Sequence, residues 1–173
     1  MRLDGEDWTR FFDAYQHDAW RLETLPVYRM PGEREMLERF LRTGRLDYPE
    51  DSPWLARVRR FRASGRTIGR VHVLTRPLTD YLRFELAAYA FTSAAGEDIR
   101  ILDLTDRENP GLPQQDFWML DNHVVEMRYD AEGRQIGRFL LDNPDLEQYR
   151  TWKHLAVHVS VPLAEYREKF LTP

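Results

Sequence analysis

The sequence predicts an α+β protein, in which N-terminal helices are followed by a β-α-β unit, a β-meander and a C-terminal helix around one mixed sheet. Helical apolar spacing dominates the first third of the chain. From residue 67, short β-branched runs separated by turn residues replace it. No linker interrupts the 173 residues, which suffice for one core. We therefore expect residues 1–173 to form a single domain, with a helical part over 1–65 and the mixed sheet over 66–173.

Three helices are expected before the first strand. The first covers residues 5–21, where apolar side chains recur at three- and four-residue spacing. The residues that carry this spacing are Trp8, Phe11, Phe12, Tyr15 and Ala19. A second helix is expected over 31–43, with Pro31 in its first turn. The pair Ser52-Pro53 starts a third over 53–63.

A β-α-β unit follows these helices. Residues 67–75 are short and β-branched, Pro77 starts a helix over 77–91, and residues 99–104 form a second apolar strand. The two strands should be parallel, with a right-handed crossover.

The remainder of the chain predicts a meander and a final helix. Residues 116–120 and 123–129 form a hairpin, because Asp121-Asn122 suits a tight turn with positive φ. Residues 134–141 add a third strand. Asn143-Pro144 caps a long helix over 144–159, and residues 161–171 are expected as a short helix or a docked tail.

Composition excludes several classes of site. The chain has no cysteine, so disulfides, thiolate metal sites and a cysteine nucleophile are excluded, and a reducing compartment fits. Neither a signal-peptide-like start nor a run of roughly 20 apolar residues is present. We expect a cytoplasmic protein without a membrane partner. Gly-rich phosphate loops and the G-x-S-x-G elbow are absent, so we expect no cofactor and no serine hydrolase.

One carboxylate stands where an apolar residue is expected. On the helix 77–91, Glu85 falls within the apolar face. That face carries Leu78, Tyr81, Leu82, Leu86 and Tyr89. A buried carboxylate must be paired, protonated or partly exposed. The preceding strand offers Arg70 and His72 on one face, and Arg21 and Arg100 are further candidate partners.

Two interpretations of Glu85 follow. As the catalytic candidates of an enzyme, Glu85, His72 and Arg70 would form a polar pocket in which carboxylate and imidazole exchange protons. As a structural feature, Glu85 would meet an arginine in an ion pair that fixes the helix to the sheet. We favour the ion pair with an arginine.

The charge distribution suggests a binding surface. Residues 52–79 contain no acid but seven arginines, whereas the whole chain has a net charge of −4. The basic helix is a candidate partner surface through Arg57, Arg59 and Arg60. The alternative is an arginine-rich helix that pairs with the acidic remainder of its own domain.

Other candidates are more isolated. Arg83 is a candidate ligand-binding residue beside Glu85. Trp118, next to Asp116, is an interaction anchor if exposed, although a core position is more usual for tryptophan. His154 and His158 have helical i, i+4 spacing, but the segment HLAVH lacks the glutamate of the zinc-protease pattern, so we expect no metal.

Several runs resemble a known family. These are HDAWRLETLPVY, GRTIGRVHVLTRPLTDYLRFELAAY, AGEDIRIL, DFWMLDNHVVEMRYDAEGRQIG and PLAEY. They are similar to an uncharacterised actinobacterial domain of unknown function, abundant in streptomycetes and often encoded near small helix-turn-helix regulators. The resemblance implies a source and a regulatory context, but no activity.

A second resemblance concerns element order, which is similar to one lobe of the phospholipase D-like fold. The hairpin strand of that superfamily carries H-x-K-x-x-x-x-D. If Asp121 matches its aspartate, Gln114 and Asp116 stand at the histidine and lysine positions. The resemblance therefore implies a lobe without its chemistry.

The sequence leads to three functional hypotheses. The first is a non-enzymatic regulatory or adaptor protein that binds a protein partner, a helix-turn-helix regulator or its small companion. The alternative is an enzyme or sensor for a phosphate-bearing or small-metabolite ligand near Glu85. Nucleic-acid binding through the arginines is less favoured, because the rest of the chain is acidic and aromatic residues do not interleave with them.

Overall fold

The computed structural model describes residues 1–171, which contain one seven-stranded mixed sheet and six α-helices. The strands are β1 (Asp18–Glu23), β2 (Thr67–Leu74), β3 (Asp98–Asp103), β4 (Phe117–Leu120), β5 (His123–Tyr129), β6 (Gln135–Leu140) and β7 (Val161–Pro162). The helices are α1 (Gly5–Asp13), α2 (Arg34–Thr43), α3 (Pro53–Ala63), α4 (Asp80–Ala95), α5 (Leu146–Val159) and α6 (Leu163–Phe170). The α+β class predicted from the sequence is confirmed.

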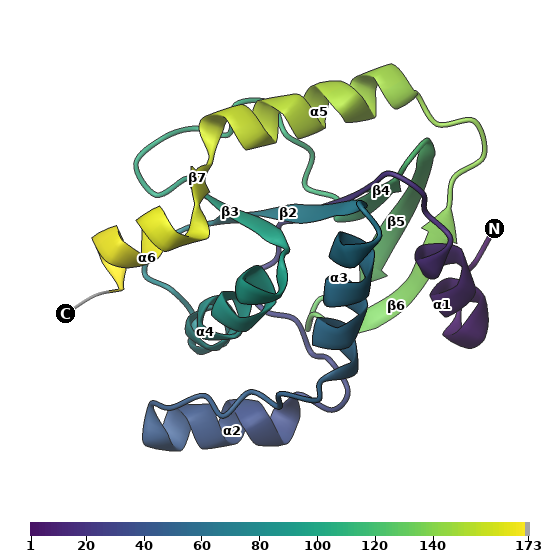
Figure 1. Ribbon diagram of the computed structural model, residues 1–173. Coiled ribbons are helices and arrows are strands. Elements are labelled where there is room, and N and C mark those ends of the chain that lie inside the picture. The colour runs from purple at the N-terminus through teal and green to yellow at the C-terminus, as the bar shows by residue number, and fades with distance from the viewer. Residues whose placement is uncertain (172–173) are drawn as a thin grey trace.

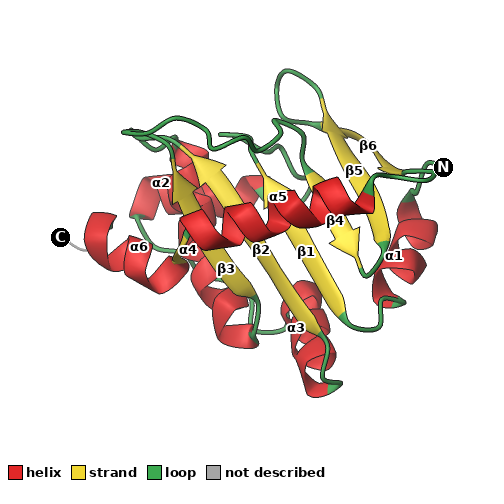
Figure 2. Cartoon of the chain, turned by 90° about the horizontal axis from the view of Figure 1, so that it is seen from above, coloured by secondary structure: helices red, strands yellow, loops and turns green. Residues whose placement is uncertain are grey.

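The sheet separates two unequal helical layers. Its strand order is β6-β5-β4-β1-β2-β3-β7, with β1, β2 and β3 parallel and β4, β5 and β6 forming an antiparallel meander. Helix α5 alone covers one face, and α1, α3 and α4 lie on the other (Figure 1). Helix α2 lies outside α4, and α5 runs across the strands on its own face (Figure 2).

The central strand β1 corrects the expected first helix. The helix predicted over 5–21 ends at Asp13, and Asp18–Glu23 is a strand paired with β2 on one side and β4 on the other. The Asp121 carboxylate accepts the backbone N–H groups of residues 16–18, at 2.7, 2.9 and 2.9 Å, and so fixes an extended chain. Sheet pairing on both sides outweighs the local helical spacing. The part expected to be helical over 1–65 therefore contains a strand besides its three helices.

The β-α-β unit and the meander are confirmed, with shifted helix ends. Helix α4 starts at Asp80 rather than at Pro77, because the Thr79 hydroxyl accepts the N–H of Leu82 at 3.1 Å. It continues to Ala95. In the hairpin, Asp121 has a φ of 52°, as its turn requires.

The two faces of the central strands differ in polarity. Trp20 and Leu22 on β1 pack with residues of α5. Arg21 and Glu23 alternate with them and point to the α4 face, because successive side chains of a strand point to opposite faces. None of the helices in the described part of the chain combines the length and apolar character needed to cross a bilayer.

Candidate functional site

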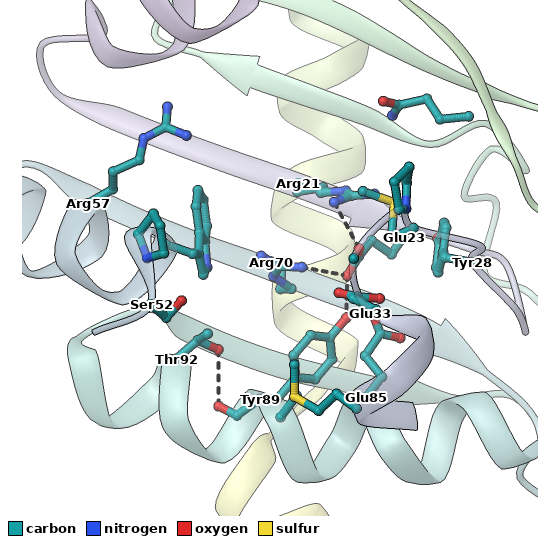
Figure 3. Close-up of a pocket in the computed structure, with 18 of the residues that line it drawn as sticks. Arg21, Glu23, Tyr28, Glu33, Ser52, Arg57, Arg70, Glu85, Tyr89 and Thr92 are labelled. Atoms are coloured by element: carbon teal, nitrogen blue, oxygen red, sulfur yellow. Dashed lines mark hydrogen bonds and ion pairs between the residues drawn. The ribbon is translucent and has the colours of Figure 1, made fainter. Parts of the chain in front are cut away.

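A pocket of about 880 Å³ lies on the polar face of the sheet. Its floor is formed by β1, β2 and β4, one wall by α4, and the outer wall by the segment 24–52, which joins β1 to α3 (Figure 3). Aromatic rings contribute about a third of the lining residues. They include Tyr28, Tyr81, Phe84, Tyr89 and Trp118. A concave, partly aromatic pocket with a few convergent polar groups is typical of small-molecule sites.

The parallel pairing of β1 and β2 brings four polar side chains together. Arg21 lies opposite Arg70 in the register, and Glu23 lies opposite His72. Residues two apart on a strand share a face, so all four point toward α4. Each strand contributes two of them, so the group of four exists only because the two strands pair.

Glu23 is the centre of the charge network. Its carboxylate forms an ion pair with Nη1 of Arg21 at 3.0 Å, and accepts from Nη1 of Arg70 at 3.0 Å and from the Tyr89 hydroxyl. The residue is 1 % exposed. Burial alone would raise the pKa of Glu23, but the two guanidinium groups hold that pKa well below its usual range. Glu23 is therefore a buried anion with two cationic partners.

Both arginines have further partners. Arg70 donates from Nε to Glu97 at 2.6 Å, and its guanidinium lies over the Tyr89 ring at 5.2 Å. Arg21 donates to the Tyr129 hydroxyl at 2.8 Å. Arg70 is thus at the site, as predicted from the sequence, whereas Arg21 was predicted only as a partner for Glu85. Neither Glu23 nor Glu97 was predicted from the sequence.

Glu85 does not meet an arginine. Its Oε2 lies 3.2 Å from Nδ1 of His72, which itself lies 3.0 Å from the Tyr89 hydroxyl. Nε2 of His72 lies 3.0 Å from the Leu25 carbonyl and must donate to it. Burial opposes the charged imidazolium, but Glu85 and Glu23 outweigh burial and raise the pKa of His72 to about 9. The predicted arginine partner is thus wrong, whereas the predicted proximity of Glu85 and His72 is confirmed.

A second carboxylate faces the same end of the pocket. Glu33 precedes α2 and accepts from the Tyr81 hydroxyl at 3.3 Å. Burial and the neighbouring Glu85 charge raise the pKa of Glu33 to about 7. No local pattern predicts a role for Glu33 at the site, because it precedes a surface helix and reaches the pocket only through the path of the segment 24–52.

Asp116 and Trp118 are buried. The Asp116 carboxylate accepts from the Tyr28 hydroxyl at 2.5 Å and from the N–H and hydroxyl of Thr24 at 2.9 and 2.7 Å. Burial raises the pKa of Asp116. Trp118 is 3 % exposed and lines the pocket beneath Arg21. Neither residue is a surface anchor. Asp116 holds the segment that leaves β1.

The arginine-rich block does not form one basic surface. Arg57 lines the pocket, but it donates to the Asp13 carboxylate at 3.0 and 2.7 Å, and Arg60 donates to the same carboxylate at 3.0 Å. Arg59 is exposed on α3. Arg83 is exposed, pairs with Asp80 and does not line the pocket. The alternative of an arginine-rich helix paired within the domain therefore holds for Arg57 and Arg60.

Three residues offer a donor set for a metal ion. One ligand atom each from Glu23, His72 and Glu85 lies within 4.8 Å of the others. Two carboxylates and an imidazole can bind divalent transition metals. However, Glu23 already forms ion pairs with Arg21 and Arg70, and the raised pKa of His72 favours its protonated form. A metal here would have to displace a proton and approach two guanidinium groups.

The fold and pocket define a small α+β protein with a buried charge network beneath an aromatic cavity. The family model described as "Domain of unknown function (DUF6879)" matches residues 6–168, and the chain belongs to this family. No curated protein and no solved structure matches the chain. The comparisons thus add no support to the phospholipase D-like likeness.

Proposed function

We propose that this chain is a non-enzymatic regulatory protein that binds a small molecule in the pocket and signals its presence to a protein partner. The carrying observation is the pocket of about 880 Å³, with aromatic walls and a floor of charges fixed by ion pairs. Such a floor costs desolvation energy and stabilises the fold weakly compared with apolar packing. Ligand binding would explain why these charges are present in the pocket floor, which packing alone does not.

The state of the candidate acid and base favours binding over catalysis. His72 is 0 % exposed, and its two nitrogens face Tyr89 and the Leu25 carbonyl. Arg70 is held between Glu23 and Glu97. A general base must reach the proton it abstracts, within about 3 Å or through one water. The sensor form of the small-metabolite hypothesis therefore has more support than the enzyme form.

Ligand binding can be tested by blocking the cavity. Ala88 lines the pocket on α4, whereas Ala94 is exposed on the same helix. We expect a metabolite library to contain compounds that raise the melting temperature of the wild type and of Ala94→Trp, but not of Ala88→Trp. Equal stabilisation of both variants would place binding elsewhere. Failure of every library compound to bind the wild type would count against the proposed function.

For the partner we propose a helix-turn-helix regulator or its small companion, contacting the exposed side of α3. Arg59 supports this surface, because it is exposed, whereas Arg57 and Arg60 are engaged with Asp13. Arg59→Glu should abolish co-purification with the partner, and the exposed Arg42→Glu on α2 should not. Retention of the partner by Arg59→Glu would exclude this surface.

Nucleic acid remains the less favoured partner. The arginines expected to form a basic surface are divided among separate ion pairs, with Asp13 near α3 and with Asp103 near the end of β3. Phosphate binding would need several unpaired cations on one face. Affinity for nucleic acid that falls steeply with salt would contradict this ranking.

A further inference from the structure

We propose that the pocket selects a ligand with a positively charged amine, whose ammonium group lies beside Glu85 and Glu33. This inference rests on the proposed function, since it names the class of ligand for the same cavity. It replaces the phosphate-bearing ligand considered from the sequence. Three observations carry it: the charge balance at one end of the pocket, the unfilled hydrogen-bonding capacity of Glu85, and the aromatic walls.

Carboxylates outnumber cations around this end of the pocket. The carboxylates are Glu23, Glu33, Glu85, Glu97 and Asp116, and the cations are Arg21, Arg70 and His72. Each cation is already within 3.2 Å of a carboxylate oxygen. Of the guanidinium groups of Arg21 and Arg70, only Nε of Arg21 is buried without a hydrogen-bond partner among the described residues, so an anionic ligand would compete with carboxylates already in place. A cationic ligand instead reduces the excess negative charge.

Glu85 keeps unused capacity to accept hydrogen bonds. It is 8 % exposed, and its buried Oε2 receives no hydrogen bond from the described residues, although it lies at ion-pair distance from His72. A buried carboxylate oxygen without a donor is costly. Glu85 and Glu33 lie on the same side of the pocket (Figure 3). An ammonium group, with three N–H donors, can bond to both.

The walls at this end suit a cation with an apolar body. Tyr81 and Phe84 precede Glu85 on α4, and Tyr28 closes the opposite side against Tyr81, with ring centroids 6.0 Å apart. Aromatic faces attract ammonium groups, and more strongly where water is excluded. The preference belongs to this end only. Arg57 lines the other end (Figure 3). It pairs with Asp13, and Arg138, packed on Trp8, also lines the pocket.

The state of Glu33 supplies an independent readout. Its pKa of about 7 reflects burial and the Glu85 charge, so part of the population is protonated at neutral pH. An ammonium group nearby favours the ionised form and lowers this pKa. Amine binding at pH 7 should therefore release protons, and the apparent binding enthalpy should vary with the ionisation enthalpy of the buffer.

The test compares three indoles of similar size by titration calorimetry: tryptamine, 3-ethylindole and indole-3-propionate. We expect tryptamine to bind most tightly and indole-3-propionate most weakly. Glu85→Gln and Glu33→Gln should each weaken tryptamine at least about tenfold, which corresponds to about 1.4 kcal/mol. Glu35→Gln, an exposed change on α2, should not. If Glu85→Gln does not fold, Glu33→Gln decides the outcome.

The outcomes separate the inference from the proposed function. Tighter binding of indole-3-propionate, or equal tryptamine affinity in wild type, Glu85→Gln and Glu33→Gln, overturns the ammonium site but leaves a small-molecule pocket in place. Absence of tryptamine binding at millimolar concentration also overturns the inference. The pocket itself is then judged by the library screen with Ala88→Trp. Divalent metals that bind in place of the amine, and lose affinity in His72→Gln, would likewise replace this inference.

Discussion

Glu85 on α4 lies 3.2 Å from His72 on β2, and the arginine of that strand, Arg70, binds Glu23 instead. The crossover helix and the strand that precedes it are thus joined by an imidazole–carboxylate pair. The Arg70 guanidinium, which could have paired with Glu85, instead joins Glu23 on β1 to Glu97, which follows the end of α4.

Removal of the Glu23 charge should destabilise the fold strongly. Glu23→Gln leaves the guanidinium groups of Arg21 and Arg70 without their shared carboxylate in a buried site. Breaking a buried ion pair costs about 3–5 kcal/mol. Urea unfolding measures the loss, and the exposed loop variant Glu108→Gln should stay within about 0.5 kcal/mol of wild type. If Glu23→Gln lowers the free energy of unfolding no more than Glu108→Gln does, solvent must reach the charge network.

Stability should decrease from neutral to alkaline pH because of His72. Its pKa rises from 6.5 in the unfolded chain to about 9 in the folded protein, because Glu85 and Glu23 outweigh the effect of burial. The contribution is therefore fully present below pH 6.5 and is lost as the pH rises through 9. Urea midpoints between pH 6 and 10 should fall in wild type and change less in His72→Gln. Parallel profiles would contradict the protonated imidazole.

Glu33 should produce a separate pH dependence at lower pH. Burial and the Glu85 charge raise its pKa from 4.5 to about 7, so its contribution to stability is full below pH 4.5 and is lost as the pH rises through 7. Glu33→Gln should flatten the profile between these values. At pH 8 it should be more stable than wild type, by on the order of 1 kcal/mol. A less stable variant at pH 8 would mean that its carboxylate forms a favourable contact.

The hairpin residue Asp121 should matter beyond its own turn. Its carboxylate accepts three consecutive backbone N–H groups, from residues 16–18, where the chain enters β1. Asp121→Gly relieves the positive φ of 52° but removes these bonds, and should cost about 1–3 kcal/mol. Asp121→Asn keeps one acceptor and should lie between glycine and wild type in urea unfolding. Wild-type stability of Asp121→Gly would show that backbone strain cancels the bonds.

The fold was largely predictable because most of its elements have local signals. Strands β2, β3 and β5 each carry β-branched residues, and the hairpin has its turn pair at Asp121. Strand β1 was missed, because Trp8, Phe11, Phe12, Tyr15 and Ala19 fit a helix that runs past Asp13. The period-two alternation of Trp20, Arg21, Leu22 and Glu23 was the available signal. It spans too few residues to outweigh the helical pattern before it.

The candidate site was predictable only in part. Glu85 and His72 could be brought together because they lie on a strand and its following helix, which must pack on each other. Glu23 and Glu33 could not be placed at the site from the sequence. The position of Glu23 depends on the pairing of β1 in the middle of the sheet, and that of Glu33 depends on the path of the segment 24–52. The wrong arginine partner for Glu85 follows directly from the missing strand.

The central position of β1 also bears on how the chain reaches its native state. β1 must pair with β2, about 50 residues later, and with β4, about 100 residues later, as in Leu22 opposite Val71 and Phe117. Contacts between distant parts of a chain slow folding, because the entropy of loop closure is lost before these contacts can stabilise the chain. The β2–β3 unit and the β4–β6 hairpins can form from nearby residues, and β1 then joins them. The insertion of β1 between the two halves is therefore expected to be the late step of folding, and a segment carrying this strand added in trans is expected to complete a chain that lacks it.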